Sequence, residues 1–423
     1  MARILRCSLN PRHRWSNGDP IKASDYVASF RRLIDPGLAS PHGDALFSVK
    51  NAKAIWNRNK SVSELGVRAP DPRTLIIELE QEDPEFEYRL IHPALAPLPP
   101  GGYVSPERAT ELVASGPYRI ADWKKQSRVR LEPNPNFPSP VRKRPPVEAL
   151  MVDSDSTALS LYEAGKLSFL RRLVARETPR FQGSRELHRI PMARFDYVGF
   201  GPELLAREPL RQLLVKSVDF ARFLDLFETL TPPGCPSIPA SYMDKPVCLR
   251  FEPDTKLKPP SPLPKLDFLF SAMGGEDIAR AAEWFQGQWK KHAGIRVELK
   301  SLEQGVYLNR LRSNPPAIFR KGVSLDRPTC LAALEIFRAG HPENYIRLNS
   351  PAFEAKLDSL ARATRPAEKR RKCRQAVEEL LRANRLIPLG EMYFTILAKP
   401  RFSGWDLNEL NQLDLSELHD SQD

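Results

Sequence analysis

Few side chains in this 423-residue sequence stand at spacings that catalysis requires. The sequence contains no GxSxG, P-loop, HExxH or GxGxxG motif, which would indicate hydrolase, nucleotide, zinc or dinucleotide chemistry. Asp153 and Asp155 could act as paired carboxylates, but they precede a helical pattern and are better interpreted as helix-start residues. The seven histidines, at positions 13, 42, 92, 188, 292, 341 and 419, include no pair at metal-ligand spacing on a helix. We therefore expect no enzyme activity, no cofactor and no metal.

The five cysteines also match no metal-binding pattern, since there is no CxxC. Only Cys235 and Cys248 are close in sequence. This pair could form a disulfide in an oxidising compartment or remain as two free thiols, and the spacing leaves both alternatives open.

The charge balance allows an acidic partner but does not specify one. Lys and Arg number 64 and Asp and Glu 52, a net charge of +12. The two signs are interspersed, and the densest basic run, residues 369–372, begins a helical pattern, so we interpret it as a solvated helix face. Binding to nucleic acid or an anionic surface is thus the rival function from another class. We expect no nucleic-acid partner.

Hydrophobic periodicity predicts a mixed α/β protein with at least two lobes. An apolar strand over 266–270 is followed by Ile278, Ala282, Phe285 and Trp289 on one helix face, and then by a strand over 295–299. This order is typical of a parallel strand–helix–strand crossover. Further strands are predicted at 74–80, 128–132 and from 386, and helices at about 24–34 (with Ser24 as N-cap), 155–166, 351–364 and 367–384.

One segment predicts an irregular connection instead. Residues 231–264 hold ten prolines in 34 positions, within a chain that has 41 prolines. Proline fixes turns and interrupts helices and central strands. No stretch approaches the ~18 consecutive apolar residues of a membrane-spanning helix.

Motifs along the whole chain resemble those of the extracellular oligopeptide- and dipeptide-binding proteins that feed ABC importers, solute-binding protein family 5. The matching segments occur in the family's order. They are 15–20 (WSNGDP), 23–27 (ASDYV), 31–33 (RRL), 63–67 (SELGV), 92–94 (HPA), 116–118 (GPY) with Trp123, 131–137 (LEPNPNF), 289–291 (WKK), 294–295 (GI), 349–353 (NSPAF), 387–389 (IPL) and 392–394 (MYF). One motif alone would be weak, but the ordered series is specific.

The resemblance implies a two-lobed periplasmic-binding-protein fold (type II, cluster C) with a hinge, enclosing a peptide between the lobes. The peptide would add as an extra strand, with its side chains in hydrated pockets. The implied division is 1–114, a small subdomain beside the large lobe; 115–194, the first part of the large lobe; 195–388, the second lobe; and 389–423, the return to the large lobe. The implied partners are a peptide ligand and ABC permease subunits in the inner membrane. A periplasmic monomer is expected.

The resemblance also places a candidate ligand site in residues 320–328 (RKGVSLDRP). Asp326 matches the family aspartate that pairs with the peptide ammonium, and Arg320 matches an arginine that some members place near the peptide carboxylate. Val323 stands where the family has tryptophan, and Arg327 where it has tyrosine. Arg327 could instead neutralise Asp326 within the chain. The predicted ligand-binding residues are therefore Asp326, Arg320, Val323, Ser324 and Arg327.

Two further departures from the family concern whole segments. Family members carry an export leader and a first stretch of the large lobe before the WSNGDP motif, which here begins at residue 15. A misassigned start codon is the expected explanation, with a fragment or a decayed gene as alternatives, and the first residues lack the apolar core of a signal peptide. The Pro-rich connection at 231–264 replaces a helical segment.

Within the same fold, a non-peptide ligand or a decayed, non-binding paralogue are the alternative functions.

Overall fold

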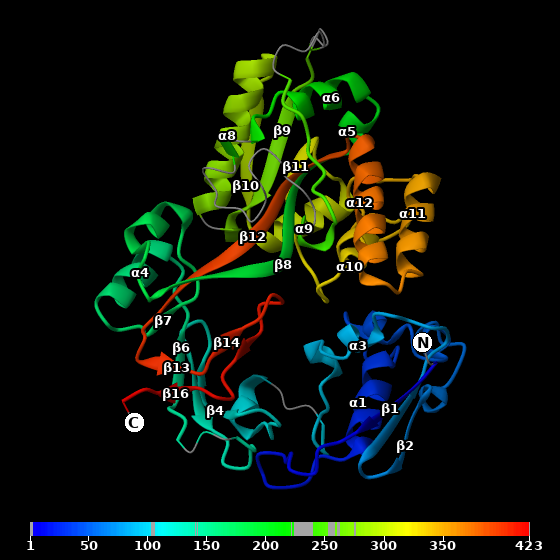
Figure 1. The fold of residues 1–423 in the computed structure, drawn as a ribbon, viewed down its shortest axis with the longest axis vertical. Helices are drawn as coiled ribbons and strands as arrows, with labels where there is room; N and C mark the ends of the chain where they lie inside the picture. Colours follow the sequence, from blue (N-terminus) through cyan, green and yellow to red (C-terminus); the bar gives the residue numbers. More distant parts are fainter. Residues whose placement is uncertain are drawn as a thin grey trace. The chain divides into compact units, whose positions relative to one another are not determined.

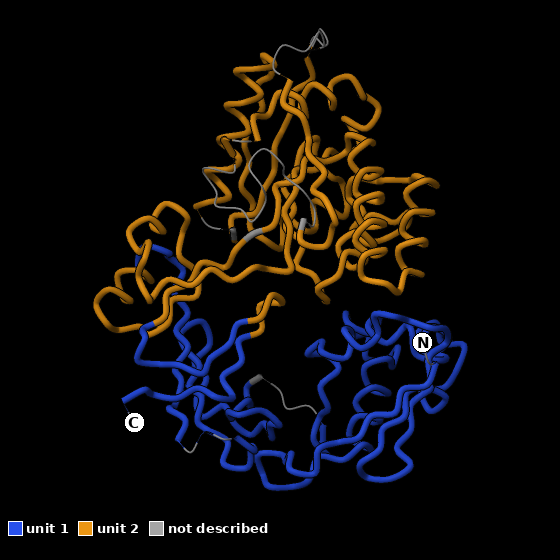
Figure 2. Tube along the Cα trace, in the orientation of Figure 1, with its two compact units in different colours: residues 1–157, 399–407, 413–423 blue, residues 158–398, 408–412 orange. Residues whose placement is uncertain are grey.

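The structure, a computed structural model, describes residues 3–102, 106–139, 141, 143–220, 222–223, 240–252, 259, 263–274 and 276–422. The chain forms two compact units, coloured separately in Figure 2. Unit 1 comprises residues 1–157, 399–407 and 413–423, and unit 2 comprises residues 158–398 and 408–412. The four-segment division into lobes stays a prediction, and two of its boundaries fall inside the continuous strands β8 (Leu187–Phe200) and β12 (Leu386–Ala398).

The first half of unit 1 packs helix α1 (Ala23–Ile34) on the antiparallel sheet β1–β3–β2. The helix buries Val27, Phe30 and Ile34, as the three-and-four spacing predicts. The strands and short helices of this half are β1 (Ile4–Ser8), β2 (Val67–Asp71), β3 (Thr74–Glu78), α2 (Ala52–Trp56) and α3 (Phe86–Arg89), with 3-10 turns at Gly43–Leu46, Val62–Glu64, Pro93–Leu95 and Pro106–Glu111.

The start of α1 differs from the prediction, because Ser24 is not the N-cap. Lys22 holds that position, and its backbone N–H donates to the Asp25 carboxylate at 2.9 Å. The same carboxylate accepts the indole N–H of buried Trp15 at 3.3 Å. Asp25 therefore secures both the helix start and the turn before it, while Ser24 is exposed.

The second half of unit 1 is built on the antiparallel sheet β4–β5–β6. Asn134, which follows β5, is fully buried and donates from its amide to the Gly116 carbonyl at 2.9 Å. Asn136 donates to the Ser16 carbonyl at 3.0 Å, so two motifs far apart in sequence are joined. The strands are β4 (Tyr118–Lys124), β5 (Arg128–Pro133), β6 (Val147–Leu150) and the short pairs β13 (Phe402–Ser403) with β16 (His419–Asp420) and β14 (Asp406–Leu407) with β15 (Leu413–Asp414).

Unit 2 is organised around a six-stranded mixed sheet with the order β10–β9–β11–β8–β12–β7 (Figure 1). Strands β9 (Leu266–Ser271) and β10 (Val297–Leu302) are parallel and are joined by α8 (Glu276–Ala293), so the predicted crossover is confirmed. Strand β11 (Ile318–Ser324) runs parallel to β9 and antiparallel to β8, while β12 pairs antiparallel with β8 and with β7 (Phe169–Leu170).

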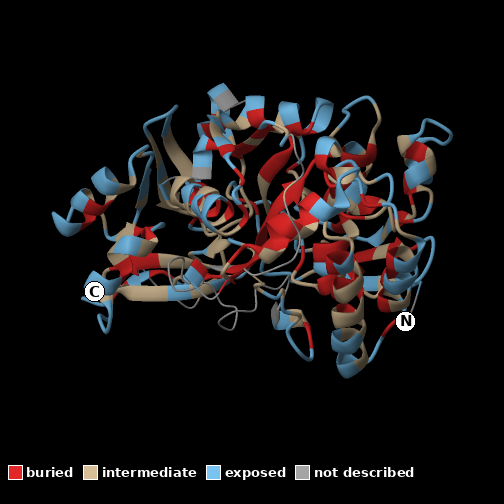
Figure 3. Cartoon of the chain, turned by 90° about the horizontal axis from the view of Figure 1, so that it is seen from above, coloured by how far each residue is buried: buried red, intermediate tan, exposed pale blue. Residues whose placement is uncertain are grey.

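Helices cover both faces of this sheet, and the central strands are accordingly apolar on both sides. Ile318 and Val198 lie in one core cluster with α6 and α8, whereas Phe319 and Tyr197 lie in the other with α9 to α12. Figure 3 shows the buried residues of the chain in red. Such two-sided burial produces continuous rather than alternating hydrophobic strands. The helices are α4 (Asp155–Glu163), whose first residues belong to unit 1, α5 (Pro202–Leu205), α6 (Glu208–Lys216), α9 (Gln304–Ser313), α10 (Cys330–Glu335), α11 (Pro351–Ala361) and α12 (Pro366–Arg382), with 3-10 turns at Ala175–Phe181, Ala240–Tyr242 and Ala272–Gly274.

Candidate ligand-binding site

The candidate site of unit 2 lies where β11 ends beside β8. Gly322 pairs with Asp196, and Ser324 pairs with Arg194. Directly paired residues of neighbouring strands project to the same face of a sheet. The face that carries the predicted Arg320 and Ser324 therefore also carries Arg194 and Asp196.

Arg194, Asp196 and Arg320 form a charged cluster on this face. Asp196 is buried, and its carboxylate accepts from Arg194 Nε at 3.1 Å and from Arg320 Nη2. Burial, and then the neighbouring Arg194 charge, lower the pKa of Arg320 well below its usual value, and burial lowers the pKa of Arg194. Among these three residues one carboxylate serves two guanidinium groups, so the cluster carries a net positive charge.

Gly322 provides the space for this cluster. A Cβ atom built on Gly322 would lie 2.4 Å from Arg194 Nη2 and 2.6 Å from Asp196 Oδ1. Contacts below 3.0 Å require the neighbouring atoms to shift. Gly322 thus leaves room for the side chains of Arg194 and Asp196, which a larger residue at this position would displace.

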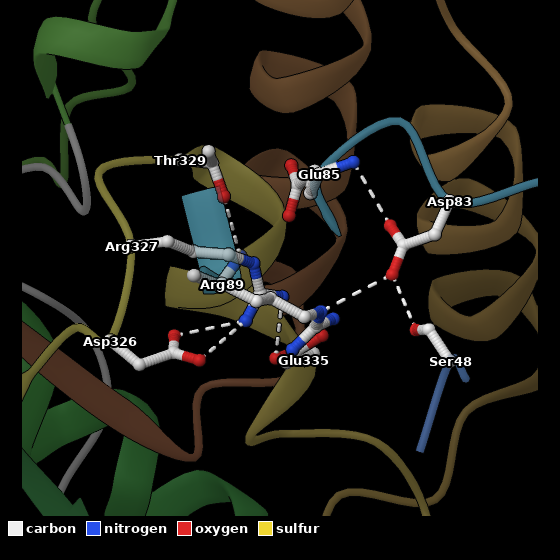
Figure 4. A network of polar contacts seen from close by, with 9 residues as sticks. Ser48, Asp83, Glu85, Arg89, Asp326, Arg327, Thr329 and Glu335 are labelled. Atoms are coloured by element: carbon white, nitrogen blue, oxygen red, sulfur yellow. Dashed lines mark hydrogen bonds and ion pairs between the residues drawn. The ribbon is translucent and has the colours of Figure 1, made fainter. Parts of the chain in front are cut away.

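Asp326 and Arg327 form an ion pair, which is the alternative that the sequence left open (Figure 4). Arg327 Nη1 donates to both carboxylate oxygens of Asp326, at 2.9 and 2.8 Å. Its Nη2 donates to Glu335 Oε1 at 2.7 Å. The Arg327 side chain is 0% exposed, whereas that of Asp326 is 42% exposed. The ammonium-binding role of Asp326 stays a prediction.

The remaining two predicted residues have different surroundings. Val323 is buried in the core cluster that includes Phe195 and Phe337. Ser324 is exposed at the end of β11. A direct ligand contact by either of them stays a prediction.

The segment that follows β11 is restrained at three points. The Leu325 N–H donates to the Ala193 carbonyl of β8 at 2.8 Å. Thr329 caps α10, because its side chain accepts from the Ala332 N–H at 3.1 Å. Cys330, the first residue of α10, is joined by a disulfide to Cys373 of α12. These bonds hold Asp326 and Arg327 between two fixed ends.

The structure contains a disulfide other than the Cys235–Cys248 pair that the sequence suggested. The Cys330–Cys373 disulfide was not predicted, since 43 residues separate the two in sequence. Cys248 is also disulfide-bonded. Cys235, its candidate partner, lies outside the described residues. Cys7 is a free thiol.

Glu391 and Asp83 are examples of carboxylates outside the candidate segment whose surroundings shift their pKa values. Buried Glu391 of β12 accepts from the Ser241 hydroxyl at 2.6 Å and from its N–H at 3.2 Å. Burial raises the pKa of Glu391 despite these hydrogen bonds, and Glu409 adds to the effect. In unit 1, Asp83 binds Ser48, the Glu85 N–H and Arg89 (Figure 4). Burial raises the pKa of Asp83, but these contacts outweigh that effect, so the pKa is lowered overall.

The described residues contain no group of three or more His, Cys, Asp or Glu side chains placed to hold a metal ion. Over the same residues, no helix is long and apolar enough to cross a bilayer. The polar clusters around Asp196 and Arg327 are suited to ionic and hydrogen-bonded recognition.

Comparisons with solved structures show that the chain has the two-lobed periplasmic-binding-protein fold, which confirms the predicted fold class. An oligopeptide-binding protein of Borrelia burgdorferi has a TM-score of 0.83 at 20% identity, over 99% of this chain and 88% of that one. The chain belongs to the bacterial extracellular solute-binding proteins, family 5, whose model matches residues 2–235.

Several curated relatives extend over almost the whole chain. The probable deoxycholate-binding periplasmic protein YgiS of Escherichia coli is 27% identical over 93% of this chain and 78% of its own length. The periplasmic oligopeptide-binding protein OppA of Escherichia coli is 24% identical over 96% of this chain and 79% of its own length.

Proposed function

We propose that the chain is the substrate-binding component of an ABC importer for peptides. The observation that carries this proposal is family membership together with the oligopeptide-binding relative that matches 96% of the chain. The partners are then a peptide and the permease subunits of the importer, and the binding protein itself is a monomer without catalytic activity.

The candidate site supplies two features suited to a peptide. The exposed end of β11 at Ser324 and the segment after it offer main-chain groups, which can pair with an extended peptide whatever its side chains are. The Arg194–Asp196–Arg320 cluster supplies a surplus positive charge for a ligand carboxylate. Arg320 is the residue that we assign to this contact, and Ser324 the one nearest the added strand.

A second candidate ligand is an amphipathic carboxylate that is not a peptide. The relative named as a probable deoxycholate-binding protein supports it, and the same positive cluster would serve its carboxylate. Such a ligand has no main chain to add to a strand. Its affinity would therefore depend more on apolar contact and on the arginine cluster.

We place the protein in the periplasm. The Cys330–Cys373 disulfide and the disulfide-bonded Cys248 support this location, since disulfides persist in oxidising compartments and are rare in the cytosol. The family description as extracellular supports it independently.

Thermal unfolding with and without ligand tests the function. A ligand at 100 times its dissociation constant stabilises the native state by about 2.7 kcal/mol. We expect di- to pentapeptide mixtures to raise the melting temperature, and double-stranded DNA at physiological salt to leave it unchanged. A shift with deoxycholate and none with peptides would favour the second candidate.

A further inference from the structure

Arg327 is a buried cation within the candidate segment 320–328. Its side chain has no exposed surface, and its guanidinium group makes two hydrogen bonds to Asp326 and one to Glu335. Both bonds to Asp326 come from Nη1, while Nη2 binds Glu335, so the one guanidinium group forms charge-assisted bonds to two carboxylates. Arg327, the next residue in the chain, therefore supplies a positive charge to Asp326.

This pairing is held by the fold. Leu325 is bonded to β8 just before Asp326, and the Thr329 N–H donates to the Arg327 carbonyl at 2.9 Å just after it. Glu335 approaches from the end of α10, and the disulfide at Cys330 ties the start of α10 to α12. To release Asp326, Arg327 would have to leave two carboxylates and give up its burial. A buried charge that loses its partners is strongly unfavourable.

We propose that Arg327 replaces a ligand ammonium group at Asp326, so that the protein accepts ligands whose amino end is blocked or absent. This inference rests on the proposed function and narrows its ligand class to N-acylated peptides and other ligands without an α-ammonium group. A free ammonium group would have to share the Asp326 carboxylate with Arg327, so it would gain less there than at an unpaired carboxylate while losing the same hydration. A blocked amino end carries no such penalty.

Calorimetric titration with matched ligands tests this. The ligands are trialanine and pentaalanine, each with a free or an acetylated amino terminus, and deoxycholate as a ligand without nitrogen. We expect the wild-type protein to bind the acetylated form at least as tightly as the free form. A tenfold or greater preference for the free amino end would overturn the inference, even though it would support peptide binding.

Two variants test whether Arg327 is responsible. In Arg327→Met/Glu335→Gln the cation and its second carboxylate are removed together, which leaves the Asp326 carboxylate without this guanidinium partner. We expect the ratio of the affinities for the free and the acetylated peptide to shift at least tenfold towards the free peptide. If the double variant does not fold, Arg327→Gln takes its place, because glutamine keeps hydrogen-bonding capacity at this position. It should shift the ligand preference in the same direction. An unchanged preference in a folded variant would overturn the assignment to Arg327.

A matched control is Arg338→Gln. Arg338 also bonds two carboxylates, Glu354 and Asp358, but these belong to α11 and not to the candidate segment. Its ligand preference should equal that of the wild type. If deoxycholate binds and none of the four peptides does, the peptide function is contradicted, while the inference of a ligand without an ammonium group stands. If none of the ligands binds, both are overturned.

Discussion

Cys330 and Cys373 join the start of α10 to the middle of α12, across a core cluster in which both residues are buried. Their bond closes a loop in which the two cysteines are 43 positions apart. The loop includes α11 and begins three residues after Arg327. The disulfide thus links the candidate segment to the helical layer formed by α10, α11 and α12.

Removing this disulfide should destabilise unit 2. Closing a loop of this length restricts the unfolded chain, and native disulfides typically contribute about 2–4 kcal/mol. We expect Cys330→Ala/Cys373→Ala to lower the free energy of unfolding by that amount in urea titrations followed by circular dichroism. Cys7→Ala, at the free cysteine, is the matched control and should change little. Equal stability of the double variant and the wild type would contradict the prediction.

Adding a methyl group at Gly322 should disturb the charged cluster. The new Cβ would lie 2.4 Å from Arg194 Nη2 and 2.6 Å from Asp196 Oδ1, so one of these groups must move away from the other. Overpacking of this kind typically costs about 1–3 kcal/mol. Thermal unfolding of Gly322→Ala should show this loss.

The control for Gly322 is the exposed Gly287 within α8, where an added Cβ meets nothing within 4 Å. Because alanine is favoured over glycine inside a helix, Gly287→Ala should stabilise the protein by about 0.5–1 kcal/mol. The two glycine substitutions should therefore have opposite signs. Stabilisation by Gly322→Ala would show that the cluster adapts freely.

Local patterns were sufficient to predict much of unit 2. The spacing of Ile278, Ala282, Phe285 and Trp289 predicted the buried face of α8, and the flanking apolar strands predicted its parallel crossover. The short strands β7 and β13 to β16 have only two residues each, so they carry no measurable periodicity. Their pairing depends on contacts that form only in the folded chain.

The site was predicted less completely, for a physical reason. Asp326 and Arg327 are neighbours, so their pairing was foreseeable as an alternative. Asp196 and Arg320 are 124 residues apart, and only the register of β8 with β11 brings them together. The family motifs at Trp15, Asn134 and Asn136 identify the fold because they hold unit 1 together, and they say nothing about the ligand.

Asp25 should prove more important than the predicted cap Ser24. Asp25→Ala removes the acceptor of the Lys22 N–H and leaves the buried Trp15 indole N–H without this bond. The lost cap costs about 1 kcal/mol and the unsatisfied indole about 1–3 kcal/mol. We expect Ser24→Ala to stay within about 0.5 kcal/mol of the wild type, as surface substitutions do. Chemical unfolding monitored by tryptophan fluorescence checks both, and a larger loss for Ser24→Ala would restore the sequence-based interpretation.

The stability of unit 2 should depend on pH through Glu391. Its folded pKa is raised, first by burial and further by Glu409, against the lowering effect of Ser241. The native state therefore holds a proton that the unfolded chain has released, between the ordinary glutamate pKa and the raised value. In that window the free energy of unfolding falls as the pH rises, and above the raised value the cost remains in full.

Glu391→Gln removes this titration and keeps an oxygen that can accept from Ser241. We expect the variant to be more stable than the wild type at pH 8, with an advantage that shrinks as the pH falls towards 4.5, the ordinary value from which the pKa of Glu391 is raised. Glu203→Gln, at an exposed position of α5, controls for the loss of one negative charge and should show no such trend. Urea titrations at pH 4.5, 6 and 8 measure the difference directly. A stability difference between Glu391→Gln and the wild type that is the same at all three pH values would show that the pKa of Glu391 is equal in the folded and unfolded chains, and would contradict the raised folded pKa.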